Sequence, residues 1–178
     1  DPEALSIGIS TSVGGGNHTT LMICLRAAGI NIKRLKTVVF PGGAASTTAL
    51  LGGHVSAINT APGNVVEHYR AGRLRTLAES SPKRLGGLFA SVPTWREQGV
   101  AADSGSWRGM LGAKGMTPAQ IAYWDRVFGA LVKTPEWKKE LEENHWDDSY
   151  ADARGAKKRL DDEYAEFKAM LGELGYAK

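Results

Sequence analysis

The chain has 178 residues, of which 42% are apolar and 23% are charged. This length accommodates one domain, or one domain and part of another, and the apolar content is enough to build a hydrophobic core. The formal charge of +3 is mild, and the basic residues alternate with apolar or acidic ones, which argues against a nucleic-acid-binding stripe. The sequence has no internal repeat, and no apolar run reaches the roughly 18 residues needed to cross a bilayer.

Cys24 is the single cysteine and lies in an apolar stretch, Leu21–Leu25. With no second cysteine it cannot form an internal disulfide, so we expect a small buried hydrophobic side chain. The sequence begins at Asp1 and Pro2 without a methionine or a signal peptide, which suggests a processed or trimmed start.

Short apolar strands alternate with helical patterns along the first hundred residues. The predicted strands are residues 5–9, 37–40, 54–59 and 73–79, and the predicted helices are residues 18–28, 44–51 and 63–71. Glycines at 52, 53 and 72 are typical of helix ends, and Pro62 suits a first helical turn. Parallel strands need right-handed crossovers and two covered faces. The pattern therefore predicts an α/β fold with a mostly parallel sheet and helices on both faces.

The chain changes character after about residue 110. A last strand is expected at residues 106–113 and a short turn at residues 93–98. Thr117 followed by Pro118 is typical of a helix start, and the rest of the chain has the spacing of amphipathic helices. We expect residues 1–110 to form the α/β part and residues 111–178 a mainly helical C-terminal segment.

Three loops that follow predicted strands are candidates for a ligand site: Ser10–His18, Phe40–Ala44 and Asn59–Pro62. They combine glycines, hydroxyls and amides, and the first two open helices whose N-terminal N–H groups stabilise a carboxylate or phosphate. Ligands in open α/β sheets lie beyond the carboxyl ends of the strands, so the three loops are expected to converge on one pocket. Alternatively, each loop is only a tight turn or a helix cap.

Motifs for catalysis and metal binding do not assemble. Gly14–Gly16 is a contiguous triplet and lacks the spacing of a dinucleotide loop, and neither glycine loop continues as a phosphate-binding loop. The four histidines lack metal-ligand spacing, so we expect no metal, no cofactor and no enzymatic activity. One enzymatic alternative stays open, in which Ser10 or Ser12 at a strand-to-helix turn acts as the nucleophile of an α/β serine hydrolase-like enzyme.

Several further runs resemble the substrate-binding proteins of tripartite tricarboxylate transporters, particularly the branch that handles tricarboxylates. The similar runs are Phe40–Ala44, Ala49–Val55, Ala71–Ala78, Arg84, Val92–Val100, Ser106–Gly109, Lys114–Pro118, Thr134–Lys138 and Glu173–Tyr176. Together, in this order, they cover nearly the whole chain.

The resemblance implies an exported bacterial protein of the periplasmic-binding-protein-like class, with two α/β lobes around a cleft. Such a receptor holds a tri-, di- or aromatic carboxylate, such as citrate, through backbone amides, hydroxyls and water. It works in the periplasm and delivers the ligand to membrane permease subunits, without nucleic acid and without inserting into the membrane itself. The positions that match the binding loops are Thr11, Ser12, Gly14, Gly15, Gly16, Asn17, His18, Gly42, Gly43, Ala44 and Thr60.

Members of this family have a first lobe before the point at which this sequence begins. The resemblance therefore implies that residues 1–110 are the second lobe and that residues 111–178 pack on an absent first lobe, leaving half a binding site here. An alternative function with the same site is a carboxylate sensor that presents its ligand to a signalling partner.

Overall fold

The computed structural model describes residues 4–176 of the chain, so Asp1 and Pro2 lie outside the described part. It divides into two compact units. The first contains the residues up to Ser106 together with those from Lys168 onwards, and the second is Trp107–Phe167. Helix α6, Ala153–Glu173, begins in the second unit and ends in the first.

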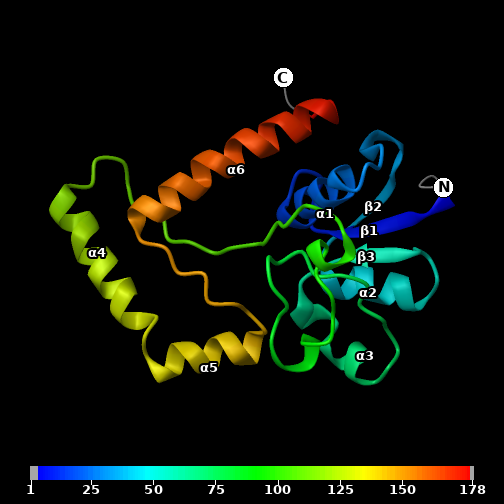
Figure 1. The fold of residues 1–178 in the computed structure, drawn as a ribbon, viewed down its shortest axis with the longest axis horizontal. Helices are drawn as coiled ribbons and strands as arrows, with labels where there is room; N and C mark the ends of the chain where they lie inside the picture. Colours follow the sequence, from blue (N-terminus) through cyan, green and yellow to red (C-terminus); the bar gives the residue numbers. More distant parts are fainter. Residues whose placement is uncertain (1–3, 177–178) are drawn as a thin grey trace. The chain divides into compact units, whose positions relative to one another are not determined.

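A three-stranded parallel sheet lies at the centre of the first unit (Figure 1). Its strands are β1 (Ser6–Ser10), β2 (Lys36–Phe40) and β3 (Ala57–Asn59), in the order β2-β1-β3. Helix α1, Gly16–Ala27, connects β1 to β2, and helix α2, Gly43–Leu51, connects β2 to β3. Ile9 of β1 pairs with Val39 and with Asn59, so the three carboxyl ends meet at one edge.

The two helices cover opposite faces of this sheet. Ile9 packs on the α1 side, in a core cluster with Leu21, Met22, Ile32 and Met170. Ser10, the next residue, points the other way and meets Ser46 of α2. Successive side chains of a strand alternate between faces, so α1 and α2 lie on different sides. The predicted α/β fold with a parallel sheet and helices on both faces is confirmed.

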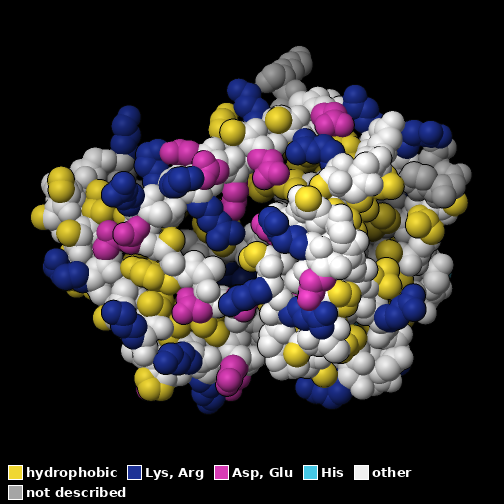
Figure 2. Space-filling model, viewed as in Figure 1, with side chains coloured by type: hydrophobic (Ala, Val, Ile, Leu, Met, Phe, Trp, Pro, Cys, Tyr) yellow, Lys and Arg dark blue, Asp and Glu magenta, His cyan; other side chains and the backbone are white. Residues whose placement is uncertain are grey.

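Cys24 is fully buried in α1, as its apolar neighbours predict. Within residues 4–176, no helix is long and apolar enough to cross a membrane. On the face shown in Figure 2, lysine and arginine side chains are spread among acidic and neutral ones and do not gather in one stripe.

The third predicted strand–helix unit is shorter than expected. Only Ala57–Asn59 of the predicted strand 54–59 pairs with the sheet, because the N–H of His54 donates to the carbonyl of Ala49 and completes the end of α2. The predicted helix 63–71 is divided into a 3₁₀ turn at Pro62–Asn64 and the short helix α3 at Val66–Arg70.

The prediction of a strand at residues 73–79 is wrong. Only an isolated bridge between Glu79 and Thr94 forms there among the described residues. Leu77, which the strand pattern places in the core, is 58% exposed, and its carbonyl accepts a hydrogen bond from Gln98. The N–H of Glu79 donates to the carbonyl of Pro93 and its carbonyl accepts the N–H of Trp95, so the end of this segment bonds to the loop around residues 93–98.

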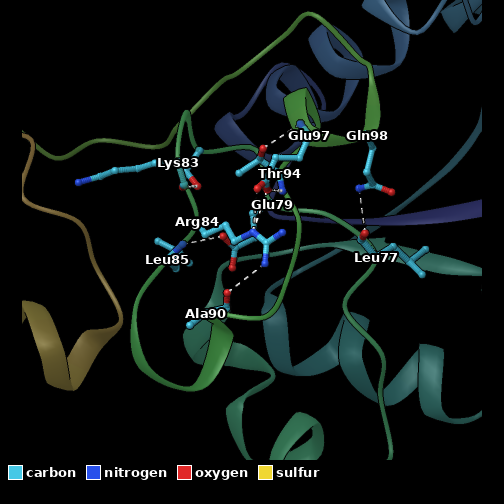
Figure 3. Close-up of polar contacts among 10 residues, drawn as sticks. Leu77, Glu79, Lys83, Arg84, Leu85, Ala90, Thr94, Glu97 and Gln98 are labelled. Carbon is cyan, nitrogen blue, oxygen red and sulfur yellow. Dashed lines mark hydrogen bonds and ion pairs between the residues drawn. The ribbon is translucent and has the colours of Figure 1, made fainter.

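That loop is held by carboxylates and an arginine, shown in Figure 3. Nε of Arg84 lies 2.9 Å from both carboxylate oxygens of Glu97, and Glu97 also accepts the N–H of Thr94 at 2.8 Å. These bonds, first that from Arg84 and then that from Thr94, lower the pKa of Glu97. The nearly buried Glu79 accepts the N–H of Leu85 at 2.8 Å. Two 3₁₀ turns lie in the same region, at Gly87–Phe89 and Arg96–Gln98.

The strand predicted at residues 106–113 is also absent, since this described segment has no regular secondary structure. Met110 and Leu111 are 78% and 84% exposed, so the apolar side chains of this segment are not buried against a sheet. At its start, Nε1 of Trp107 donates to Glu163 of α6 at 2.7 Å, and the guanidinium of Arg159 lies over the indole ring.

The second unit is helical, as predicted. Helix α4 spans Pro118–Leu131 and helix α5 spans Pro135–Asn144. Thr117 and Gln120 form a capping box at the start of α4, which confirms the helix start read from the sequence. Trp124 and Phe128 stack along α4 with ring centroids 5.6 Å apart, yet Trp124 is 46% exposed. The apolar stripe of α4 is therefore only partly covered in this unit.

Candidate functional site

The polar residues at the carboxyl ends of the strands form one connected cluster. The hydroxyl of Ser10, at the end of β1, lies 3.1 Å from that of Ser46 in α2 and donates to Thr60 at 3.3 Å. Asn64 donates to the same Thr60 hydroxyl at 2.9 Å. The structure thus brings the third candidate loop against the end of the central strand.

The first candidate loop turns sharply between β1 and α1. Thr11 has φ 85°, a left-handed conformation that is rare for a β-branched residue, and its N–H donates to Phe40 at the end of β2. Gly14 has φ 78°, and the N–H of Gly15 bonds back to the carbonyl of Ser12. A Cβ on Gly15 would lie 2.8 Å from the Ser12 hydroxyl oxygen, so a side chain there would displace the Ser12 hydroxyl.

Helix α1 begins with uncapped backbone amides that face this loop region. The first helical hydrogen bond is donated by Thr19 to the carbonyl of Gly15, and no side chain caps the helix. The amides of Gly16, Asn17 and His18 precede that bond and have no acceptor within the helix. Amides in this position carry the positive end of the helix dipole and stabilise an anion.

The second loop approaches the third through a glycine. Gly43 is the first residue of α2, and a Cβ there would lie 2.1 Å from Nδ2 of Asn64. Ser46 donates its hydroxyl to the Gly43 carbonyl at 2.9 Å. Gly42 is extended and Ala44 is exposed in the first turn of α2. The loops after β2 and β3 thus come close together where Gly43 meets the side chain of Asn64.

A further link joins the third strand to the first helix. Nδ2 of Asn59 donates to the carbonyl of Asn17 at 2.5 Å. The structure therefore places all eleven predicted positions in the loops and helix starts at one edge of the sheet. It adds Ser46 and Asn64, which lie outside the candidate loops, and it draws in Ser10 and Asn59, which lie in those loops but were not among the eleven positions. Ser10 and Asn59 had a usable signal, since each is the last, polar residue of a strand.

The loops of this edge contain no charged residue: residues 10–18, 40–44 and 59–64 are apolar, glycine, hydroxyl, amide or histidine. Thr11, Ser12, Gly14 and Gly16 are exposed to solvent. An anion bound here would be held by N–H and O–H dipoles. Among the described residues, no cluster of three histidine, cysteine or acidic side chains is suited to hold a metal ion.

His18 is the one buried residue among the eleven predicted positions. Its Nδ1 accepts the N–H of Gly14 at 3.2 Å, and its ring meets that of Tyr176 edge-on, with centroids 6.3 Å apart. Burial lowers the pKa of the imidazole. His18 also lines a cavity of about 250 Å³ on the α1 side of the sheet, together with Met22, Ile32, Lys33, Leu35, Thr37, Leu174 and Tyr176.

The serines do not have the geometry of an activated nucleophile. Ser10 is 2% exposed, and its hydroxyl bonds to Ser46 and Thr60. Ser12 is exposed, but Nδ1 of the nearby His18 is occupied by a backbone N–H. A hydroxyl needs an adjacent base to attack a substrate, and this arrangement provides none at either serine.

The first unit is thus an α/β unit with glycine loops and an uncapped helix N-terminus at the carboxyl ends of its parallel strands. Residues 1–176 match the family described as "Tripartite tricarboxylate transporter family receptor" (TctC). The chain belongs to this receptor family, which confirms the resemblance seen in the sequence.

Known proteins agree with this assignment. The chain is 26% identical over 164 residues to the "UPF0065 protein in gbd 5'region" of Cupriavidus necator, covering 92% of this chain and 50% of the relative. It is similar in fold to a TctC solute-binding protein from Polaromonas solved without ligand, with a TM-score of 0.78, 24% identity and coverage of 96% of this chain and 57% of that one. It is also similar to R. palustris Rpa4515 with adipate, with a TM-score of 0.75, 19% identity and coverage of 99% and 57%. The chain thus spans about half the length of these relatives.

Proposed function

We propose that this chain is part of an extracytoplasmic solute receptor that binds a small tri-, di- or aromatic carboxylate in the periplasm and delivers it to the permease subunits of a tripartite tricarboxylate transporter. The observation that carries the proposal is the uncapped start of α1 beside the charge-free loops 10–18, 40–44 and 59–64. In this arrangement backbone amides stabilise a carboxylate and the ligand is held without being chemically changed.

The proposed ligand-binding residues divide into donors and shape-giving glycines. The amides of Gly16, Asn17 and His18 and the hydroxyls of Thr11, Ser12 and Thr60 are the donors. The other proposed positions have no side chain or a small one, so that a ligand can approach the backbone; they are Gly14, Gly15, Gly42, Gly43 and Ala44. Neutral donors suit reversible transport, because a ligand held by a buried ion pair would be released slowly. Membership of a transporter receptor family and the structural neighbour Rpa4515, solved with adipate, are consistent with this ligand class.

The second unit has a separate proposed role. Ile121, Tyr123, Trp124 and Leu131 of α4 are each 39% or more exposed. Large exposed apolar groups in one place are typical of interfaces. We propose that this segment packs on another lobe of the full-length receptor, as expected for residues 111–178. The end of α6 differs, because Met170 is fully buried in the core of the α/β unit.

Calorimetric titration and thermal shift with adipate, citrate and benzoate test the receptor proposal, with the present chain and a version of receptor length compared. A saturable rise in melting temperature for one carboxylate, with the ligand recovered unchanged, supports it. Ligand at a hundred times its Kd should stabilise the folded state by about 2.7 kcal/mol. No response to any of the three in the longer protein, or covalent labelling of Ser10 or Ser12 by a fluorophosphonate, contradicts it.

A variant pair makes the test specific for the site. Gly43→Ala places a methyl group against Asn64, whereas Gly86→Ala is a matched control, since a Cβ on Gly86 would meet nothing within 4 Å. The first substitution should weaken carboxylate binding and the second should leave it unchanged. Equal effects of the two would show that the ligand binds elsewhere.

A further inference from the structure

His18 connects the candidate binding loop to the C-terminal end of the chain. On one side its Nδ1 accepts the N–H of Gly14, in the middle of the loop. On the other side its ring packs edge-on against Tyr176. Leu171 lies beneath the same loop, 3.9 Å from where a Cβ of Gly14 would be. The loop thus packs near Leu171 and Tyr176, and the hydrogen bond between Gly14 and His18 holds it in place.

This hydrogen bond exists only in one protonation state. Nδ1 accepts a proton when the imidazole is neutral and carries its hydrogen on Nε2, whereas both nitrogens are donors in the imidazolium. Protonation would therefore set an N–H of His18 against the N–H of Gly14. Gly14, at φ 78°, would have to turn away, and the amides that follow it at the start of α1 would move with the loop.

We propose that His18 is a positioning residue: as a neutral acceptor it holds Gly14, and with it the carboxylate-binding loop, so that ligand affinity falls when His18 takes up a proton. This inference rests on the proposed function. It assigns to His18 a role other than direct contact with the ligand through its ring, since the ring is buried and its loop-facing nitrogen is occupied.

The groups around the ring favour the neutral form. Lys33 and Tyr176 line the same cavity as His18, and within residues 4–176 that lining includes no carboxylate. Glu173, on the adjacent end of α6, is paired with Arg26 at 3.7 Å. Burial lowers the pKa of His18. The proton is thus taken up only in acid, below the ordinary histidine value of about 6.5.

Two substitutions separate the hydrogen bond from the charge. In His18→Asn the side-chain oxygen takes approximately the place of Nδ1, so the acceptor is kept but does not titrate. In His18→Leu both are lost. His54→Asn is the matched control, because His54 is exposed just after the end of α2 and is distant in sequence from the loop of residues 10–18.

The first measurement needs no ligand. Nitrogen-15 NMR of the full chain from pH 8 to 5 follows the His18 ring and the Gly14 amide together. We expect the Nε2–H tautomer at pH 8 and a common midpoint for both signals below about 6.5. His18→Asn should leave the Gly14 amide insensitive to pH, and His54→Asn should change nothing. A Gly14 amide that does not follow His18 overturns the proposal.

The second measurement is the Kd for adipate, citrate and benzoate in the receptor-length protein at pH 7.5 and 5.5. For whichever binds, affinity should fall by up to about tenfold for each pH unit below the His18 midpoint. His18→Asn should bind within roughly threefold of the original protein at pH 7.5 and should lose no affinity through position 18 at pH 5.5, whereas His18→Leu should bind roughly threefold to tenfold more weakly than the original protein at pH 7.5. Citrate and adipate take up protons of their own between pH 7.5 and 5.5, so the effect of His18 is read from the affinity of the original protein relative to that of His18→Asn. An original protein that loses no affinity relative to His18→Asn at pH 5.5 overturns the proposal.

The two measurements distinguish the two proposals. If none of the three carboxylates binds at pH 7.5, the proposed function is refuted, and the coupling of His18 to the loop is still decided by the NMR titration. If a carboxylate binds but the two NMR signals titrate independently, the receptor function stands and the role of His18 is refuted.

Discussion

Gly43→Ala, measured together with Asn64→Ala, is a quantitative test of the approach between the loops after β2 and β3. The new methyl group would lie 2.1 Å from Nδ2 and 2.2 Å from Cγ of Asn64, which is too close for any real contact. Asn64 is exposed, so its side chain can swing away, but it then loses its hydrogen bond to Thr60. That bond contributes about 0.5–1.5 kcal/mol.

The free energies expected for the variants follow from this geometry. Alanine is a better helix former than glycine by up to about 1 kcal/mol, which offsets much of the loss in Gly43→Ala. Asn64→Ala alone should cost about 0.5–1.5 kcal/mol. In the Asn64→Ala background there is neither clash nor bond to lose, so Gly43→Ala should there be neutral or stabilising. The coupling energy between the two substitutions should therefore be about 0.5–1.5 kcal/mol.

Urea unfolding followed by circular dichroism gives the four free energies of this cycle, with Gly86→Ala as the control for glycine replacement without contact. A coupling energy below about 0.3 kcal/mol would mean that Gly43 and Asn64 act independently. The close approach of the two loops would then not be what requires glycine at position 43.

Three other substitutions test features of the fold and the site. Thr11→Gly should raise the free energy of unfolding by up to about 1 kcal/mol, because threonine is strained at φ 85°; a loss in urea titration would contradict this. Thr117→Ala should cost about 1 kcal/mol by removing the capping box of α4, seen as faster amide exchange in its first turn, with unchanged exchange as the contrary result. Trp107→Phe should cost about 1–2 kcal/mol by removing the bond to Glu163, and Glu163→Gln, which keeps an acceptor, should cost less; the reverse order would refute a role for this bond.

The stability of the chain should depend on pH through His18. The folded state lowers the pKa of this group, so the unfolded chain takes up the proton first as the pH falls. The free energy of unfolding is therefore undiminished above about pH 6.5 and decreases from there as the pH falls through the folded-state pKa. His18→Asn should remove this part of the pH dependence in urea titrations at pH 7.5 and 5, and an unchanged slope would contradict it.

The parts of the fold that the sequence predicts well are those with a strong local pattern. The β1–α1–β2–α2 unit is predictable because apolar runs, glycine ends and helical spacing coincide within residues 5–51. The start of α4 is predictable from Thr117 and Pro118 for the same reason. Element ends differ by one or two residues, as expected where the cap geometry is not visible in the sequence.

The predictions that failed depend on partners distant in the chain. Residues 73–79 and 106–113 are predicted as strands, but a strand exists only if another strand pairs with it, and no local pattern reports that. The candidate site is similar. Its glycine loops are visible in the sequence, whereas the contact of Asn64 with Gly43 and the hydrogen bond from Gly14 to His18 depend on how loops meet in space.

The burial of Met170 in the core of the first unit has a consequence for synthesis. Ile9 and Met170 pack in the same cluster, although almost the whole chain separates them. While the ribosome is still making the last helix, the apolar side of α1 has no cover from the end of α6. The first unit cannot complete its core until Met170 has emerged, so the nascent chain depends on long-range closure and exposes apolar surface to aggregation or chaperones until then.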